Sequence, residues 1–425
     1  MIVNTPFART KRALITLAAV ASAALLAAVA CAPKDEIAPW EEGYLDIHAI
    51  NTGRGECMYY VFPDGTTMLV DAAGSTLKQH KYMPTDARPD STVSSGTVIT
   101  RYIRHFAPEI AGNTVDYVVL SHYHSDHMGD FAPETPFHPD GFRLSGICEV
   151  GAELYFGTIL TRGSAEEVWS PNMSKKEILD NFMNFVAWSE NENGTELDWF
   201  KPGVDDQIVP KHKDIPGFKV QNIAASGYVW TGEGTQTATA IPPRATLEAL
   251  DDPHAWPPEN ILSSVFILSY GDFDIFSGGD IQYKAPRTPG YDYSYLNIEA
   301  PISKVVKEVE VMKASHHCTS GTNSQEILDA LKPQVVVANV WRDVQPNAKT
   351  LGRIYNTNPD CKVFLTNLAP KNEPVISEYL DRIASKGGHI MIRVAKGGRK
   401  YMVYTLDDGG FDYKVTGKWG PFKCK

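Results

Sequence analysis

The sequence predicts a mixed α/β protein, and three observations carry this prediction. Residues 44–50 alternate between apolar and polar side chains, and residues 115–120 form the continuous apolar run of a buried strand. Residues 174–188 instead repeat apolar side chains at helical spacing. The composition, with 43% apolar and 21% charged residues, is that of a globular protein rather than of a disordered one.

The remaining elements follow from the same patterns, read along the chain. The opening segment predicts three short strands, with a Gly-rich turn at 51–57 and a Pro-Asp-Gly turn at 63–65 between them. A helix is expected at 95–106 and a strand hairpin at 259–277. The C-terminal part predicts helices at 301–308, 328–331 and 351–355, each followed by a strand, and three strands after residue 389.

Four side chains able to bind a metal fall within six residues, directly after the buried strand at 115–120. They are His122, His124, Asp126 and His127. A turn can direct all four towards one centre, whereas a strand would send alternate side chains to opposite faces. Imidazole and carboxylate ligands together suit zinc, with iron and manganese as alternatives. The sequence therefore predicts a metal site in this loop.

This motif resembles the signature of the metallo-β-lactamase fold. The wider pattern, from about Leu45 to about Thr366, is similar to the branch that contains the C-terminal domain of the competence DNA-uptake protein and the phosphorylcholine esterases. The resemblance implies an α+β fold, a four-layer αββα sandwich with a two-metal site at one edge. Residues 44–425 would form this domain, with a long insert at about 131–258.

The resemblance also implies roles for residues outside the motif. Asp71 would brace the histidine loop, unless it is simply an acid at a strand end. Asp280, just past the hairpin, would bridge both metals. His317 would bind the second metal and His316 would donate a proton or hold the substrate, although these two roles could be exchanged. Asp126 and His316 are the expected catalytic residues.

The chain departs from the family pattern at two places. Cys318 replaces the usual glycine after the histidine pair, which leaves the local backbone open. No histidine stands where many members carry a third ligand for the first metal, and His254, in a Pro-rich loop, is the alternative. Phosphorylcholine-esterase-like members also lack that ligand. The first metal would then be held by His122, His124 and Asp280.

These residues predict a hydrolase with two divalent metal ions, in which water between the metals attacks the substrate. Two metals can stabilise both the attacking and the leaving oxygen of a phosphoester, so a phosphodiesterase acting on a small or head-group substrate is the first expectation. The alternatives are a nuclease of the DNA-uptake type, a lactam or thioester hydrolase, and a non-catalytic surface lipoprotein that binds a ligand.

The charge of the chain bears on its partners. The formal net charge is −11, and removal of residues 1–30, with three basic residues and no acid, would change it to −14. Such a chain lacks the general attraction to phosphate backbones on which nucleic-acid binding depends. The insert is rich in aromatic residues instead, which suits a compact lipid or glycan head group such as a quaternary amine.

Residues 1–30 have the order of a secretory signal, a basic start followed by an apolar stretch. Cys31 after small residues resembles a bacterial lipobox, which implies lipidation of Cys31 and a membrane anchor followed by a linker to residue 43. Cleavage near Ala30 without lipidation, or a retained helix, are the alternatives. We expect an outer-membrane lipoprotein on either the periplasmic or the surface face. The six cysteines contain no Cys-x-x-Cys and predict neither a disulfide framework nor a zinc ribbon.

Overall fold

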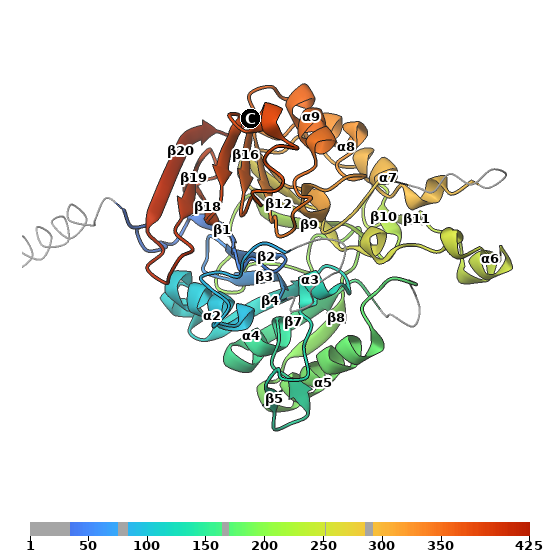
Figure 1. Ribbon diagram of the computed structural model, residues 1–425, viewed down its shortest axis with the longest axis horizontal. Helices are drawn as coiled ribbons and strands as arrows, with labels where there is room; N and C mark the ends of the chain where they lie inside the picture. The colour runs from blue at the N-terminus through green and yellow to red at the C-terminus, as the bar shows by residue number, and fades with distance from the viewer. Residues whose placement is uncertain (1–34, 75–83, 164–169, 251, 285–291) are drawn as a thin grey trace, which may run out of the picture.

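The computed structural model describes residues 35–74, 84–163, 170–250, 252–284 and 292–425. The predicted signal segment and Cys31 lie outside the described residues. The described part is built around two nine-stranded sheets. In Figure 1 the helices α7, α8 and α9 lie on one side of the molecule, and α2, α4 and α5 lie on the opposite side.

We call the two sheets sheet 1 and sheet 2. Sheet 1 consists, from edge to edge, of β20 (Val415–Lys423), β19 (Lys400–Leu406), β18 (His389–Val394), β1 (Leu45–Ala49), β2 (Cys57–Val61), β3 (Thr67–Ala72), β4 (Thr114–Leu120), β7 (Tyr155–Thr161) and β8 (Glu196–Trp199). Its pairs from β3 to β8 are parallel and the others antiparallel.

Sheet 2 has the same plan. It consists of β11 (Thr237–Thr239), β10 (Tyr228–Trp230), β9 (Phe218–Ala225), β12 (Val265–Tyr270), β13 (Phe273–Ser277), β14 (Val311–Lys313), β15 (Val335–Ala338), β16 (Lys362–Leu365) and β17 (Ile383–Lys386). Its pairs from β13 to β17 are parallel. A small ribbon, β5 (Phe137–His138) with β6 (Phe142–Arg143), stands apart.

The helices cover the outer faces of the sheets or close the loops between strands. The α-helices are α2 (Ser95–Phe106), α3 (Ser125–Met128), α4 (Ile147–Glu153), α5 (Lys176–Asn193), α6 (Arg244–Ala249), α7 (Glu299–Ser303), α8 (Gln325–Leu331) and α9 (Ala348–Thr357). Short 3-10 turns are η1 (Glu109–Ala111), η2 (Pro253–Ala255), η3 (Glu259–Leu262), η4 (Ser294–Leu296), η5 (Ser315–Cys318) and η6 (Ser377–Tyr379).

Three apolar clusters define the layers. One lies between the sheets and combines residues such as Tyr60 and Val119 of sheet 1 with Phe266 and Val337 of sheet 2. A second packs α2, α4 and α5 on the outer face of sheet 1, and a third packs α8 and α9 on the outer face of sheet 2. This arrangement confirms the predicted four-layer αββα sandwich.

Helix α2 shows how the sequence makes one of these layers. The side chain of Ser94 accepts the backbone N–H of Thr97 and so caps the first turn. Val98, Ile99 and Tyr102 then repeat at helical spacing and are buried. The helix therefore forms where the sequence predicts it, with its apolar side on sheet 1.

One predicted helix differs from the expectation. The helix predicted at 301–308 is wrong in length, because α7 ends at Ser303, just before the β-branched pair Val305 and Val306, which disfavours continued helix. The segment 131–258 adds β7 and β8 to sheet 1 and β9, β10 and β11 to sheet 2, so its strands extend the sandwich itself.

The described residues contain no helix long and apolar enough to cross a membrane. Their five cysteines are free thiols. Parallel strands end together at one edge of each sheet, and the loops that leave β3, β4, β13, β14 and β15 carry the predicted metal ligands or their neighbours.

Candidate metal centre

The loop after β4 is braced by Asp71, which lies at the end of the adjacent strand β3. Asp71 accepts hydrogen bonds from the Ser121 backbone N–H, from the Ser121 hydroxyl and from His127 Nδ1, each at 2.7 Å. All three residues are buried. The structure thus places Asp71 beside the histidine loop, as the resemblance implied. Its carboxylate orients the loop at Ser121 and the imidazole of His127.

Hydrogen bonds at the back of each imidazole settle which nitrogen faces the centre. His127 donates Nδ1–H to Asp71, and His317 donates Nδ1–H to the Asn339 carbonyl at 2.9 Å. His124 donates Nε2–H to the Asn172 carbonyl at 2.8 Å. In the neutral tautomers that these bonds select, the lone pairs of His127 Nε2, His317 Nε2 and His124 Nδ1 remain for another partner.

His122 follows the same rule. Because the Ser121 hydroxyl donates to Asp71, its oxygen accepts from His122 Nδ1, 3.0 Å away. The His122 Nε2 lone pair then lies 3.0 Å from Nδ1 of His124. Two acceptors this close are stable only with a positive charge between them. The geometry therefore calls for a cation or a proton at this point.

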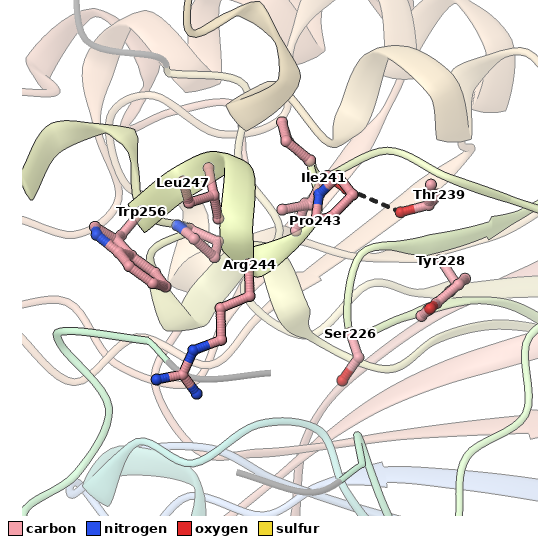
Figure 2. A pocket seen from close by; sticks show the side chains of 10 residues that line it. Ser226, Tyr228, Thr239, Ile241, Pro243, Arg244, Leu247 and Trp256 are labelled. Atoms are coloured by element: carbon pink, nitrogen blue, oxygen red, sulfur yellow. Dashed lines mark hydrogen bonds between the residues drawn. The ribbon is translucent and has the colours of Figure 1, made fainter. Parts of the chain in front are cut away.

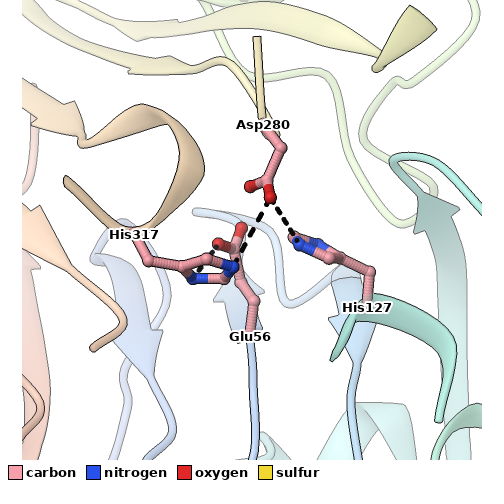
Figure 3. Close-up of side chains that lie close together, drawn as sticks. All are labelled: Glu56, His127, Asp280 and His317. Carbon is pink, nitrogen blue, oxygen red and sulfur yellow. Dashed lines mark ion pairs between the residues drawn. The ribbon is translucent and has the colours of Figure 1, made fainter. Parts of the chain in front are cut away.

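The carboxylate of Asp280 stands at the middle of these imidazoles. Its Oδ2 lies 3.2 Å from His127 Nε2, 3.5 Å from His317 Nε2 and 4.0 Å from His122 Nε2. A second carboxylate oxygen, Oδ2 of Asp126, lies 3.2 Å from His317 Nε2. The structure thus brings the histidine motif together with Asp280 and His317. Figure 3 shows Asp280 and His317 with His127 and Glu56, all pointing towards one another.

These residues fit a divalent metal ion. Both oxygens of Asp280 and the Nε2 atoms of His127 and His317 are buried without a hydrogen-bond partner. Ligands about 2.0–2.2 Å from one tetrahedral zinc lie roughly 3.3–3.5 Å apart, which is the spacing found around Asp280 Oδ2. The donor set, imidazole nitrogen with carboxylate oxygen, is also the set that zinc prefers.

Glu56 is a further acid at this centre that the sequence patterns did not single out. It lies within reach of the ligand group of His127, Asp280 and His317. Its Oε2, however, lies 2.6 Å from Nζ of Lys313, a fully buried cation. Because a buried ammonium needs an opposite charge, we assign Glu56 to the neutralisation of Lys313.

Lys313 in turn connects this pair to the ligands. Its Nζ donates to the carbonyl of Gly279 at 2.8 Å and lies 3.9 Å from Oδ1 of Asp280. The backbone of Glu56 donates to the Asp126 carbonyl at 2.9 Å, and the preceding Gly55 allows this approach, since a Cβ there would lie 2.4 Å from the same oxygen. The pair of Glu56 and Lys313 therefore holds the backbone next to Asp280 through the Gly279 carbonyl.

The second histidine loop has an unusual backbone. His316, His317 and Cys318 all have positive φ, at 50°, 54° and 61°. Left-handed conformations cost a non-glycine residue roughly 1–2 kcal/mol, so the surroundings must hold the turn. Asn323 does so, because its side chain accepts from the Ser315 N–H and donates to the Ser315 carbonyl, both at 3.0 Å. Cys318 thus adopts the conformation that a glycine would adopt freely.

Of the two histidines, His317 faces the ligand group, whereas His316 lies at its rim. His316 Nε2 is 3.7 Å from Asp280 Oδ2, and Asn260 Nδ2 is 3.0 Å from His316 Nδ1. The His316 side chain is 25% exposed, against 1% for His317. His316 is therefore the one of the pair that a bound molecule could reach.

Burial and neighbouring charges act in opposite directions on these groups. Burial lowers the pKa of His122 well below its usual value and lowers the pKa of His316 to about 4. Burial also opposes the charged form of His127, but the carboxylates of Asp280 and Asp71 outweigh it and raise its pKa. For Asp280 itself, the surrounding histidines overcome burial and lower the pKa.

His254 lies elsewhere, exposed in η2 and outside the ligand group. Arg342, after β15, was not predicted, although its guanidinium lies 3.9 Å from Oδ2 of Asp126 and its side chain is 18% exposed. No local pattern marks Arg342. Lys313 is a charged residue inside an apolar strand, and this was the one sequence signal for the buried pair of Glu56 and Lys313.

A buried ion pair ties the metal loop to the 131–258 segment. Arg162 donates to both oxygens of Glu259, at 2.6 and 2.8 Å, and its guanidinium lies 4.6 Å from the centre of the Tyr123 ring. Glu259 also accepts the Tyr123 N–H, and its own N–H donates to Asn172, whose carbonyl holds His124. The contacts of Arg162 and Glu259, which we call the clamp, thus fix the backbone at Tyr123 and, through Asn172, the imidazole of His124.

Comparison with known proteins gives one family match. Residues 52–133, which include Asp71 and the histidine motif, match the model of the metallo-beta-lactamase superfamily. No curated protein matches the chain.

Two solved structures share a limited likeness. One is a protein from Parabacteroides distasonis that is described as a metal-dependent hydrolase. Its identity to this chain is 11% and its TM-score is 0.34, and the alignment covers 79% of this chain and 100% of the other. The other is Igni18, a metallo hydrolase from the archaeon Ignicoccus hospitalis, at 13% identity and a TM-score of 0.30, covering 82% and 98%. Both TM-scores are below 0.5, so neither likeness bears on fold or function.

The matched segment supplies the histidine motif and its brace, and the sandwich brings Asp280 and His317 to the same edge. The cluster of buried ligand atoms that results is the kind of site at which this superfamily binds divalent metals. The chain therefore carries a segment that matches the metallo-beta-lactamase superfamily, inside a sandwich that gathers candidate metal ligands at one edge.

Proposed function

We propose that the protein is a phosphodiesterase that uses about two divalent ions, zinc first among them, on a small substrate. The observation that carries the proposal is the position of Asp280 Oδ2. It lies 3.2 Å from His127 Nε2, 3.5 Å from His317 Nε2 and 4.0 Å from His122 Nε2. A carboxylate oxygen near imidazoles from both predicted ligand sets suits a ligand shared by two ions.

Each predicted ligand can be assigned to one of two ions, with Asp280 assigned to both. His122, His124 and Asp280 would hold the first ion, and Asp126, His127, His317 and Asp280 the second. The first set has only three protein ligands, which leaves a position for substrate or water, as a catalytic zinc requires. A divalent ion supplies Lewis-acid chemistry there, because it polarises a substrate oxygen and activates water.

The side chains around the ligands would act on the substrate. Arg342 lies close enough to Asp126 to hold that carboxylate and is exposed enough to bind a phosphoryl oxygen as well. His316, at the rim, can hold the leaving oxygen by a hydrogen bond from its neutral imidazole. The guanidinium of Arg342 favours an anionic group such as a phosphoester.

The charge of the whole chain favours a small substrate over a long nucleic acid. At −11 the protein repels a polyanion, and screening over about 8–10 Å at physiological salt removes only the distant part of this repulsion. A small diester needs only the local charges of the metal centre and Arg342. The nuclease is therefore the second candidate, after a phosphodiesterase that acts on a small substrate.

The test is a substrate panel on the metal-loaded protein. We expect turnover of bis-nitrophenyl phosphate, little cleavage of single-stranded DNA and no turnover of a chromogenic cephalosporin. His316→Ala should reduce turnover while metal content stays unchanged. Fast DNA cleavage with negligible diester turnover would favour the nuclease, and cephalosporin turnover alone would favour the lactamase.

We also propose that the protein is a cell-envelope lipoprotein, on the sequence pattern around Cys31 alone. Cys31→Ser should abolish lipid labelling and release the protein from the membrane fraction. Unchanged membrane partition of the variant would contradict lipidation. Protease treatment of intact cells then separates the surface face from the periplasmic face.

A further inference from the structure

A cavity of about 430 Å³ is lined by Asn172, whose carbonyl holds His124, and by residues that follow Asp280 in the chain. It lies within the size range of small-molecule sites, roughly 300–1,000 Å³. Its described walls come from residues 171–172, residues 253–258, residues 282–284 and Leu296.

The cavity is connected to the ligands by hydrogen bonds in two of its walls. Asn172, in one wall, accepts His124 Nε2–H through its carbonyl at 2.8 Å. Lys284, also in the lining, follows Asp280 by a few residues, and its N–H donates to the carbonyl of Gly321, just past the second histidine loop. The cavity is therefore connected to His124 through Asn172 and to the loop after Asp280 through Gln282 and Lys284.

The chemistry of the walls restricts the occupant. The apolar part consists of the Trp256 indole, Leu296 and three prolines, Pro171, Pro253 and Pro258. The polar part consists of Asn172, His254, Gln282 and Lys284. Among the described lining residues there is one fixed charge, the cation of Lys284, and no carboxylate. Such walls accept a flat apolar group and repel a cation.

Trp256 also borders a second cavity, of about 220 Å³. Figure 2 shows it, with Trp256 and Leu247 on one side and Tyr228 and Ser226 on the other. This volume is below the usual size of a ligand site. The larger cavity is the one that can serve the reaction.

We propose that the larger cavity binds a ring-shaped apolar ester group of the substrate, one that carries no positive charge. This inference rests on the proposed phosphodiesterase function and narrows its substrate class to aryl or heterocyclic phosphoesters. It also replaces the quaternary amine expected from the aromatic content of the insert, because a cationic head group would meet Lys284 without a compensating acid among the described walls.

Three phosphonate or phosphate ligands test this directly on the zinc-loaded protein: phenylphosphonate, methylphosphonate and phosphocholine. Binding is measured by calorimetry, so that turnover is not required. Phenylphosphonate should bind on the order of tenfold more tightly than methylphosphonate, because its ring is removed from water. Phosphocholine should bind no better than methylphosphonate.

Two variants and a control locate the effect. Trp256→Ala should remove the preference for the phenyl group and leave methylphosphonate binding unchanged. Lys284→Glu should improve phosphocholine binding about tenfold or more, and it serves as the independent test if Trp256→Ala fails to fold. Trp199→Ala, an exposed tryptophan on β8, should change none of the affinities.

The outcomes separate the two proposals. Equal affinity for the phenyl and methyl ligands, or tighter binding of phosphocholine to the wild type, would overturn the inference and leave the phosphodiesterase proposal standing. Failure of all three ligands to bind the zinc-loaded protein would overturn both. A phenyl preference that survives in Trp256→Ala would also overturn the inference, since the ring would then lie elsewhere.

Discussion

Replacement of Asp71 by Asn should weaken metal binding although Asp71 is not a ligand. The carboxylate accepts three hydrogen bonds of 2.7 Å, from the Ser121 N–H, the Ser121 hydroxyl and His127 Nδ1. The amide keeps one oxygen and replaces the other with a donor, so at least one buried donor loses its acceptor. His127 then no longer has its Nδ1 held as a donor, and its Nε2 is no longer fixed towards Asp280.

The expected magnitude follows from these contacts. Loss of a partner that orients a ligand typically reduces metal affinity 10–100-fold, which corresponds to about 1.4–2.7 kcal/mol. A buried donor without an acceptor costs a further 1–3 kcal/mol or so of folding free energy in the metal-free protein. Zinc affinity is measured by competition with a chromophoric chelator, and stability by urea unfolding of the metal-free protein.

Asp116 provides a matched control on the same pair of strands. It accepts the Thr67 N–H and the Thr67 hydroxyl, at 2.8 and 2.9 Å, at the end of β3 and β4 opposite to the metal loop. Asp116→Asn should lower stability but leave zinc affinity unchanged. If both variants lost affinity equally, or if Asp71→Asn lost none, the assignment of Asp71 as the brace of His127 would be refuted.

Three further predictions test other parts of the structure. Burial raises the pKa of Glu299 from 4.5 to about 7, so the folded state binds a proton that the unfolded state has released. The free energy of unfolding should therefore fall by on the order of 3 kcal/mol as pH rises between these values. In urea unfolding, Glu299→Gln should lack this pH dependence, and an unchanged pH dependence would contradict the prediction. Arg342→Ala should lower kcat/KM for a phosphodiester about 10–100-fold with metal content unchanged, and a parallel loss of metal would instead show that Arg342 mainly holds Asp126. Arg162→Leu leaves the buried Glu259 without its cation and should cost about 3–5 kcal/mol; replacing Glu259 by Leu as well should restore part of the loss, and no restoration would rule out the uncompensated charge as the cause.

The parts of the fold that could be predicted are those set by local pattern. β1, β3 and β4 have alternating or continuous apolar runs, and α2 combines a serine cap with helical spacing. The histidine motif was equally visible, because its residues lie within one turn after a strand. The position of Asp280 and His317 beside it came from the resemblance, since no local rule brings distant loops together.

The missed residues act through contacts between segments far apart in the chain. Glu56 gains its role only from Lys313, and each alone is an ordinary charged residue. The clamp of Arg162 with Glu259 likewise joins β7 to a loop before β12. Lys313 inside a buried strand gave a warning, because a buried ammonium requires a partner. The sequence did not say which acid would supply it.

The most direct test of the account is the metal content of the purified protein, measured by elemental analysis after reconstitution with zinc and removal of excess ion. The geometry around Asp280 predicts about two ions per chain. Asp280→Ala should lose most of both, because it serves both ligand sets, whereas His254→Ala should retain them. A wild-type protein that binds no zinc, or an Asp280→Ala variant that keeps its full content, would contradict the shared-ligand centre from which the proposed function follows.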